Sequence, residues 1–410
     1  MRVCFVSRRY WPAVSGMSVY AENLLRELVA LGHEVTLVSS YRDDEAGTRV
    51  YGGGPPPPDR VPAGVRVMAV PSRGETVVPA DFEGDVQELA DTVVRLHGER
   101  PFDVLHAQYG YPPGLAVLAA SRATGVPNLV SIQGGDGHWV GTCCGTHKAA
   151  ITTVLDRAGA VLIGSASFRD EVVGHHGTDP DRFTIVPGAT DTSRFTPGPR
   201  PLGALSDPPV LLFHGRTDRR KGVLDLLDAY DRLRADGRDL RLMVSGIGPD
   251  LDEVRARVEG DRSVELTGYT APDDAPAVYR SADVFVSPTY SEGFSNTILE
   301  AMASGLPVVS TDSVGVVDCL RHGDNGLLHQ PGDVSGLARL LALVLDDAAL
   351  RTSLAETALA EVRRLYSWPV LGRSIDAAYR DLVGTAPDLD WSPPTSIDLD
   401  CRFRAAPHLL

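Results

Sequence analysis

The sequence predicts an α/β protein made of two doubly wound lobes, each built on a parallel β-sheet. Short apolar runs alternate with segments of helical spacing, and a single proline-rich stretch near the middle interrupts this alternation. The 410 residues, 43% of them hydrophobic, are enough for two or three cores. Strands that are apolar throughout belong to a sheet covered on both faces. We expect the lobes to face one another across a cleft at the carboxyl ends of their strands, where a ligand binds.

The first lobe is expected over residues 1–190. Its predicted strands are Arg2–Ser7, Glu34–Ser40, Val65–Pro71, Asp103–Gln108, Asn128–Gln133, Ala160–Gly164 and Thr184–Pro187. Its clearest helical patterns are Val19–Leu31, Val86–Leu96 and Gly114–Thr124. A Pro/Gly-rich segment, 51–62, holds four consecutive prolines and is predicted to be an exposed loop, because prolines cannot pack as a regular element.

The second lobe is expected over residues 191–365, after a linker at Pro187–Pro209 that is rich in proline and small polar residues. Its predicted strands are Val210–His214, Arg241–Val244, Val264–Leu266, Val284–Ser287, Val308–Ser310 and Gly326–His329. The return of the same alternation predicts a second doubly wound sheet.

Composition and charge exclude several function classes. The net charge of −15 argues against nucleic-acid binding and weakly disfavours an acceptor held on an anionic membrane. The first apolar run is too short for a signal peptide, and no window approaches the roughly 20 apolar residues of a membrane span. The five cysteines form no C-x-x-C pair. We therefore expect a cytoplasmic protein without a disulfide framework.

The stretch Tyr290–Asp312 predicts a loop, a short helix and a buried strand. Ser295 or Asn296 can cap the helix, which closes at Ser304-Gly305. Free N–H groups at a helix start receive phosphate oxygens, and carboxylates accept pairs of hydroxyl hydrogen bonds. Glu292 before the helix and Glu300 within it would therefore suit a nucleotide sugar. The alternative is an ordinary strand–loop–helix unit with solvated glutamates.

A second candidate site follows the predicted strand that ends at His214. The turn Gly215-Arg216-Thr217-Asp218-Arg219-Arg220-Lys221-Gly222 carries four cations between two glycines. Arginine donates paired hydrogen bonds to phosphate oxygens and lysine supplies a compact positive charge, so this turn suits a diphosphate. Lys148 and Lys221 are the only lysines of the chain. The alternative is a solvated basic turn.

In the first lobe, Gly16 lies between the first strand and the first helix, where a glycine lets backbone approach a phosphate or sugar. The surrounding spacing is not G-x-G-x-x-G, which argues against a dinucleotide-dependent oxidoreductase.

The loop Gln133–His147 contains zinc-ligand residue types, namely His138, Cys143, Cys144 and His147. Adjacent cysteines are poorly placed to chelate one metal, and no standard ligand spacing is present. We therefore predict no metal site, and interpret the loop as part of an acceptor site or as a structural turn.

Several motifs occur together in an order that resembles a retaining glycosyltransferase of family four, with the two-lobed GT-B fold. The residues that carry the resemblance, over Met1–Leu382, are 15–24 (Ser-Gly-Met-Ser-Val-Tyr-Ala-Glu-Asn-Leu), 32–38, 102–107, 186–195, 215–222, 291–309 and 324–328.

The resemblance implies roles for individual residues. Glu292 would face the donor sugar, Glu300 would hold the ribose hydroxyls, and Arg216 and Lys221 would bind the diphosphate. Gly16 matches the second of two glycines usually found at its position, with Ser15 in place of the first. The loop whose backbone meets sugar and phosphate would comprise Gly293, Phe294, Ser295 and Asn296.

Gln133 departs from the family pattern, because a histidine that contacts the donor sugar is common at this position. Glutamine cannot take up a proton at neutral pH, although it can offer a hydrogen bond. A mechanism that needs a histidine acid or base at this position is therefore not expected. Alternative polar contacts to the sugar or acceptor are His106, Tyr109, Asp136 and His138.

The resemblance implies front-face transfer with retention of configuration, from a nucleotide diphosphate sugar to a hydroxyl group, without a divalent metal or other cofactor. The expected donor is a UDP-hexose or UDP-N-acetylhexosamine, with GDP and ADP left open. The expected acceptor is a small polar sugar, cyclitol or secondary metabolite. Alternatives are a polysaccharide or lipid-linked acceptor, a nucleotide-sugar epimerase, a phosphorylase and a non-catalytic binder.

The carboxyl end also resembles the family. Residues 366–384, with Trp368 as a packing anchor, resemble a helix that returns to brace the first lobe. Residues 385–410 are rich in Pro and Asp, and we expect an irregular tail.

Overall fold

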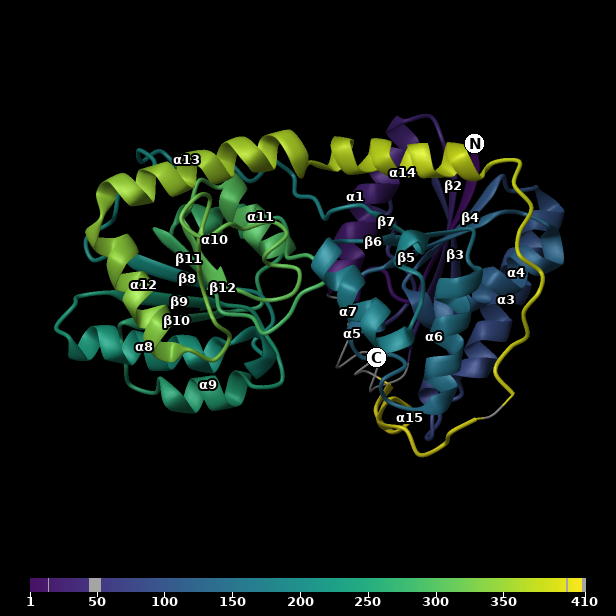
Figure 1. Cartoon of the computed structure of the whole chain (residues 1–410), viewed down its shortest axis with the longest axis horizontal. Helices are drawn as coiled ribbons and strands as arrows, with labels where there is room; N and C mark the ends of the chain where they lie inside the picture. The colour runs from purple at the N-terminus through teal and green to yellow at the C-terminus, as the bar shows by residue number, and fades with distance from the viewer. Residues whose placement is uncertain (14, 44–52, 396, 408–410) are drawn as a thin grey trace. The chain divides into compact units, whose positions relative to one another are not determined.

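The structure is a computed structural model, which describes residues 1–13, 15–43, 53–395 and 397–407. The chain divides into two compact units: residues 1–187 with 368–410, and residues 188–367. Each unit contains one wholly parallel sheet with helices packed on it (Figure 1). The prediction of two doubly wound lobes is confirmed.

The first unit is built on a seven-stranded sheet in the order β3-β2-β1-β4-β5-β6-β7. Its strands are β1 (Arg2–Ser7), β2 (Glu34–Tyr41), β3 (Val65–Pro71), β4 (Val104–Gln108), β5 (Asn128–Ile132), β6 (Ala160–Ile163) and β7 (Phe183–Ile185). The inner strands are buried along nearly their whole length, which accounts for their unbroken apolar sequence. The strand order reverses between β1 and β4, and this switch point is the usual place for a ligand in such sheets.

Helices cover both faces of this sheet. They are α1 (Gly16–Ala30), α3 (Phe82–Glu99), α4 (Leu115–Thr124), α5 (Gly135–His138), α6 (Gly145–Arg157), α7 (Ala166–His176), α14 (Trp368–Leu382) and α15 (Arg402–Ala405). Short helical turns are η1 (Pro58–Arg60), η2 (Gly74–Thr76), η3 (Gly110–Gly114) and η4 (Pro180–Arg182). The predicted loop at 51–62 lies outside the described residues at 51 and 52, and is irregular over 53–62 except for η1.

α14 packs beside α1 (Figure 1), and the two helices meet through small and aromatic side chains. Trp368 makes an edge contact with Tyr20, with ring centroids 5.5 Å apart. A Cβ atom on Gly372 would lie only 2.8 Å from Cβ of Glu27, so the close approach of the helices depends on this glycine. α14 therefore belongs to the first unit, as the sequence predicted.

The tail after α14 lies along the first unit and makes specific contacts with it. Asp388 pairs with Arg157 at 3.0 Å, and the guanidinium of Arg122 stacks on Trp391 at 4.5 Å. Backbone N of Asp398 donates to Thr146 Oγ1. The tail is irregular, as expected, apart from the single turn of α15.

The second unit is built on a six-stranded sheet in the order β10-β9-β8-β11-β12-β13. Its strands are β8 (Val210–His214), β9 (Arg241–Ser245), β10 (Val264–Gly268), β11 (Val284–Ser287), β12 (Val308–Thr311) and β13 (Leu327–His329). Its helices are η5 (Arg219–Lys221), α8 (Val223–Ala235), α9 (Leu251–Arg257), α10 (Ala275–Arg280), α11 (Asn296–Ala303), α12 (Val334–Asp346) and α13 (Ala348–Leu365). Two clusters of buried aliphatic and aromatic side chains form its core.

The predicted linker at Pro187–Pro209 packs on the second unit rather than forming a free connection. Asp283 at the start of β11 holds it, because its carboxylate accepts hydrogen bonds from Arg200 Nη1 and from backbone N of Ser206. These bonds fix the chain where it enters β8.

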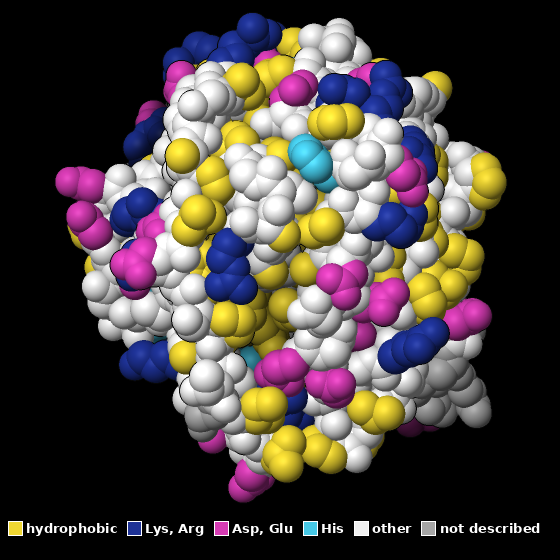
Figure 2. Space-filling model, turned by 90° about the vertical axis from the view of Figure 1, so that its right-hand side faces the viewer, with side chains coloured by type: hydrophobic (Ala, Val, Ile, Leu, Met, Phe, Trp, Pro, Cys, Tyr) yellow, Lys and Arg dark blue, Asp and Glu magenta, His cyan; other side chains and the backbone are white. Residues whose placement is uncertain are grey.

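No helix in the described part of the chain is long and apolar enough to cross a membrane. Figure 2 shows the face of the first unit, where arginine side chains and carboxylates are interspersed over the described surface. The charges on this face do not form one broad cationic surface of the kind that binds nucleic acid.

Candidate functional site

In the second unit, two loops emerge side by side at the reversal of strand order. β8 pairs with both β9 and β11, so the turn after β8 and the loop after β11 lie at the carboxyl edge of the sheet. These are the basic turn Gly215–Gly222 and the loop that carries Glu292. The topology thus brings together the two segments that the sequence singled out separately.

Glycines allow the basic turn to pack backbone against backbone. A Cβ atom on Gly246, in the loop after β9, would lie 1.8 Å from the carbonyl oxygen of Gly215, and its φ of +141° also disfavours a side chain. Gly222, with φ +72°, leaves no room for a Cβ against the carbonyl of Pro288. The turn is therefore held between the loops after β9 and β11.

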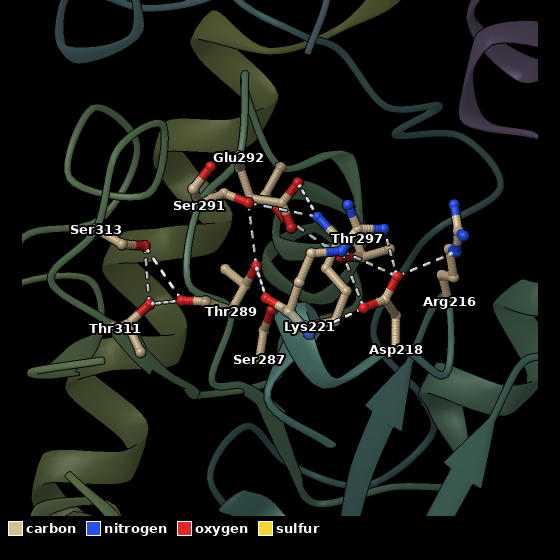
Figure 3. A network of polar contacts seen from close by, with 12 residues as sticks. Arg216, Asp218, Lys221, Ser287, Thr289, Ser291, Glu292, Thr297, Thr311 and Ser313 are labelled. Atoms are coloured by element: carbon tan, nitrogen blue, oxygen red, sulfur yellow. Dashed lines mark hydrogen bonds and ion pairs between the residues drawn. The ribbon is translucent and has the colours of Figure 1, made fainter. Parts of the chain in front are cut away.

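Lys221 and Glu292 face one another in this site, as Figure 3 shows. Lys221 Nζ lies 2.7 Å from Glu292 Oε2 and 3.5 Å from the carbonyl oxygen of Ser291. The side chains are 32% and 18% exposed, so the pair is reachable from solvent. The predicted proximity of cationic turn and acidic loop is seen directly in this ion pair.

The arginines of the turn have different partners. Arg216 is half exposed and lies 3.4 Å from Asp218 Oδ2, and Figure 3 shows its guanidinium extending away from the Lys221 pair. Arg219 instead pairs with Asp250 and Glu253 near α9. Arg220 donates to Asp218 through Nε and Nη2. All three arginines are at least half exposed, but Arg219 and Arg220 are engaged in close ion pairs, whereas the contact of Arg216 with Asp218 is longer.

Helix α11 starts beside this ion pair. Its N-cap is Ser295, one of the two residues predicted for this role, but the side chain makes no capping hydrogen bond. Its hydroxyl lies 3.3 Å from Thr297 Oγ1 instead. The Ser295 side chain therefore does not cap the amide groups of the first turn, including that of Asn296. An anion could accept hydrogen bonds from these N–H groups.

Glu300, one turn further along α11, is partly buried against Tyr279. The phenol donates to Glu300 Oε2 at 2.7 Å. Burial raises the pKa of Glu300 to about 7, although the Tyr279 hydrogen bond opposes the rise. Tyr279 in turn packs edge-on against His214 at the end of β8, with centroids 5.2 Å apart. Glu300 can therefore change protonation near neutral pH.

In the first unit, Gly16 is the first residue of α1 and is exposed. Ser15 caps the helix by accepting a hydrogen bond from backbone N of Ser18. A Cβ atom built on Gly16 meets nothing within 4 Å. The fold itself therefore leaves space for a side chain here.

Asp136 is fully buried, and its carboxylate accepts hydrogen bonds from the backbone of two loops. Its Oδ1 accepts from backbone N of Gln133 and Gly134, and its Oδ2 accepts from backbone N of Gly110. Burial raises its pKa, and the three backbone hydrogen bonds oppose the rise. Asp136 thus fixes the loops after β4 and β5 relative to one another.

Gln133 is half-buried directly after β5. Its Oε1 accepts from Gln108 Nε2 at 3.0 Å, and Gln108 also accepts from the Ser7 hydroxyl. This amide chain joins the carboxyl ends of β1, β4 and β5. Tyr109 follows Gln108 with φ +90° and is buried, so its ring lies against these loops.

The two candidate histidines have structural partners. His106 is fully buried within β4, with Nδ1 2.6 Å from Tyr379 Oη and Nε2 2.8 Å from Ser131 Oγ, and burial lowers its pKa to about 3. Both ring nitrogens are occupied, so His106 is placed as a core residue rather than as a ligand contact. His138, 5% exposed, pairs with Glu171 at 2.7 Å and packs on Phe168.

Sequence reasoning missed the loop Gly246-Ile247-Gly248 and the aromatic residues behind Glu300. A G-x-G pattern after a predicted strand could have indicated the loop. No local pattern marks Tyr279, because it lies in the last turn of α10, 21 residues before Glu300 in the sequence.

Comparisons with known proteins agree with this arrangement. Residues 15–189 match the family described as glycosyl transferase 4-like domain, and residues 208–347 match glycosyl transferases group 1. The chain is 30% identical over 372 residues to a D-inositol 3-phosphate glycosyltransferase of Pseudarthrobacter chlorophenolicus, covering 84% of this chain and 85% of the relative. It is 27% identical over 407 residues to a glycogen synthase of Mycobacterium tuberculosis, covering 92% and 94%.

Solved structures share the fold at lower identity. Anabaena HepE in complex with UDP and glucose superposes with a TM-score of 0.73 at 16% identity, covering 93% of this chain and 99% of that one. Sucrose-phosphate synthase from Thermosynechococcus elongatus gives a TM-score of 0.74 at 20% identity, covering 93% and 98%.

Proposed function

This chain belongs to family 4 of the glycosyltransferases and has the GT-B fold, and on that premise we propose that it is a retaining transferase. It moves a hexose or N-acetylhexosamine from a UDP-sugar to a hydroxyl of a small polar acceptor. The observation that carries the proposal is the Lys221–Glu292 ion pair, formed between the basic turn that also carries Arg216 and the loop that leads into α11, at one edge of the second sheet.

Arg216 and Lys221 are the groups that stabilise the departing diphosphate. Negative charge develops on the leaving group in the transition state, and cations fixed beside it lower the barrier. Lys221 is held by Glu292 and the Ser291 carbonyl before a ligand arrives. Phosphate oxygens would take over part of this contact, and the ammonium is already oriented by its present partners.

The rest of the donor meets the loop Gly293–Asn296 and α11. The amides at the start of α11 receive an anion, and Glu300 accepts the two ribose hydroxyls. Glu292 faces the transferred sugar. HepE, which shares the fold, has been solved with UDP and with UDP-glucose, which supports a UDP-sugar as donor.

Transfer proceeds on the front face of the donor sugar. The acceptor hydroxyl forms its bond to the anomeric carbon on the side from which the diphosphate leaves, and its proton passes to a phosphate oxygen. No protein base is needed, which accommodates Gln133 in place of a histidine. No divalent metal is required, because Arg216 and Lys221 supply the positive charge.

A cyclitol or cyclitol phosphate is the preferred acceptor class. The relatives at 28–30% identity include D-inositol 3-phosphate glycosyltransferases, and Gln133 lies directly after β5 in the first unit, where it can offer a hydrogen bond to a hydroxyl. A polyol acceptor offers the hydroxyl that the reaction consumes.

The test is a screen of UDP-, GDP- and ADP-sugars for nucleoside diphosphate release, with and without inositol, inositol phosphate and simple sugars, in the presence of a chelator. We expect acceptor-dependent UDP release and a product whose anomeric configuration by NMR equals that of the donor. An inverted product, isomerisation of the donor without acceptor, or a strict need for magnesium or manganese would contradict the proposal.

A further inference from the structure

A cluster of three cysteines and one histidine lies in the first unit, where the start of α6 packs against η3 and the tail. It consists of Cys143, Cys144, His147 and Cys401, whose sulfur and ring nitrogen atoms all lie within 4.8 Å of one another. Cys401 comes from the tail, 254 residues from His147 in sequence. The sequence placed the first three in one loop with His138, and their spacing argued against a metal; in the structure His138 pairs with Glu171 instead. The structure adds Cys401 to the other three.

Three distances within the cluster lie within about 0.4 Å of those expected for tetrahedral coordination. Zinc–sulfur bonds of about 2.3 Å and zinc–nitrogen bonds of about 2.0 Å place two sulfurs about 3.8 Å apart, and a sulfur about 3.5 Å from a nitrogen. Cys143 Sγ lies 3.9 Å from Cys144 Sγ. Nδ1 of His147 lies 3.1 Å from Cys143 Sγ and 3.5 Å from Cys401 Sγ.

The start of α6 explains how adjacent cysteines can share one centre. Cys144 is the N-cap of α6 and His147 is the third residue of the helix, so both side chains lie over the same end. Cys144 Sγ accepts a hydrogen bond from backbone N of His147 at 3.5 Å. Cys143 precedes the cap in the turn, and its sulfur reaches the same point. The helix end thus replaces the usual C-x-x-C turn.

Aromatic side chains border the cluster, which is partly closed to solvent. His147 is fully buried and its ring packs 5.0 Å from Tyr111 and 5.6 Å from Phe82, while Cys401 is 4% exposed. Cys143 and Cys144 are half-buried, which leaves a path from solvent. A soft S₃N ligand set in such a setting is typical of a structural zinc site.

We propose that Cys143, Cys144, His147 and Cys401 bind one Zn²⁺ ion, which fastens the carboxyl-terminal tail to the first unit. The ion replaces the thiol protons of three cysteines and completes a Cys₃His shell without an open position, so it has no part in sugar transfer. Contacts on both sides of Cys401 bring the tail to the same place. Asp398 accepts from backbone N of Thr146, and Arg404 pairs with Glu83.

The test is the zinc content of the full-length chain, purified under reducing conditions and dialysed without chelator, by elemental analysis. We expect about one zinc per chain in the wild type and in Cys319→Ala, which removes a buried cysteine of the second unit. Cys401→Ser is expected to lower retained zinc at least tenfold. Cys401→His, which keeps a ligand, is expected to retain it. Cobalt(II) should give the visible absorption of tetrahedral thiolate coordination in the wild type and not in Cys401→Ser.

Tail attachment provides a second readout. Removing zinc with a chelator should speed proteolytic cleavage within residues 383–400, and adding zinc back should slow it again. The proposal is overturned by a wild-type chain that neither retains nor takes up zinc, by equal zinc loss in Cys319→Ala and Cys401→Ser, or by a disulfide between Cys401 and Cys143 or Cys144 in the native protein.

Discussion

The two units place polar side chains at the carboxyl ends of their strands in different ways. In the second unit, Arg216, Lys221 and Glu292 remain 50%, 32% and 18% exposed. In the first unit, Asp136, which follows β5, is fully buried and accepts three backbone hydrogen bonds. A polar residue after a strand can therefore either meet a ligand or hold the loops that surround one. The partners of the side chain, rather than its chemistry, decide between these roles.

Of the substitutions that test this difference between the units, Asp136→Ala should have the largest effect. Asp136→Ala leaves three buried N–H groups without their acceptor, and each costs about 1–3 kcal/mol. We expect the first unit to lose about 3 kcal/mol or more of unfolding free energy, measured by denaturant titration. Unchanged stability together with a loss of donor or acceptor binding would instead make Asp136 a ligand contact.

Lys221→Ala should lower turnover about a hundredfold while leaving the fold intact, because the residue acts on the leaving group. Arg219→Ala is the matched control, since this cation lies in the same turn but pairs with Asp250 and Glu253. Its turnover should stay close to that of the wild type. Steady-state kinetics of UDP release provides the measurement, and equal losses in the two variants would refute the assignment.

Donor binding should depend on pH through Glu300, whose pKa burial raises to about 7. Below this pH the carboxyl group holds a proton and accepts ribose hydroxyls poorly; above it, the carboxylate accepts both. We expect UDP-glucose to bind about tenfold more weakly at pH 6 than at pH 8 by calorimetry.

Two variants test the origin of this pH dependence. Glu300→Gln should abolish it. Tyr279→Phe removes a hydrogen bond that favours the carboxylate, so it should move the midpoint to higher pH. A midpoint that stays in place in Glu300→Gln would assign the titration to another group.

Gly16→Ala should have the smallest effect on the fold, because a Cβ atom meets nothing within 4 Å and alanine favours a helix start. The free energy of unfolding should be unchanged or rise by up to about 1 kcal/mol. If a donor phosphate or sugar approaches this backbone, KM for the donor rises in the same variant. An unchanged KM would place the donor away from Gly16.

Much of the fold could be predicted because strands buried on both faces have unbroken apolar sequences. The limits of β1, β3, β8 and β11 coincide with the predicted ones. The pair of acidic and basic loops was also predictable, since the carboxyl ends of neighbouring strands meet at one edge.

What could not be predicted depends on contacts between distant residues. The tail contributes Cys401 to a cluster 254 residues away, and α10 contributes Tyr279 to Glu300. Likewise, His106 was a candidate contact because the sequence does not show that it is buried. Its burial arises from the position of β4 between β1 and β5 in the sheet. Such pairings follow from tertiary packing, which no local pattern encodes.

We propose that the second unit binds the nucleotide and that Gln133 in the first unit contacts only the sugar or the acceptor. Calorimetric binding of UDP to the full-length chain tests it most directly. Arg216→Ala should weaken UDP at least tenfold, since hydrogen bonds to charged groups contribute about 1.5–3 kcal/mol. Gln133→Ala should leave the Kd of UDP unchanged. Unaltered UDP binding in Arg216→Ala, or a comparable loss in Gln133→Ala, would contradict the account.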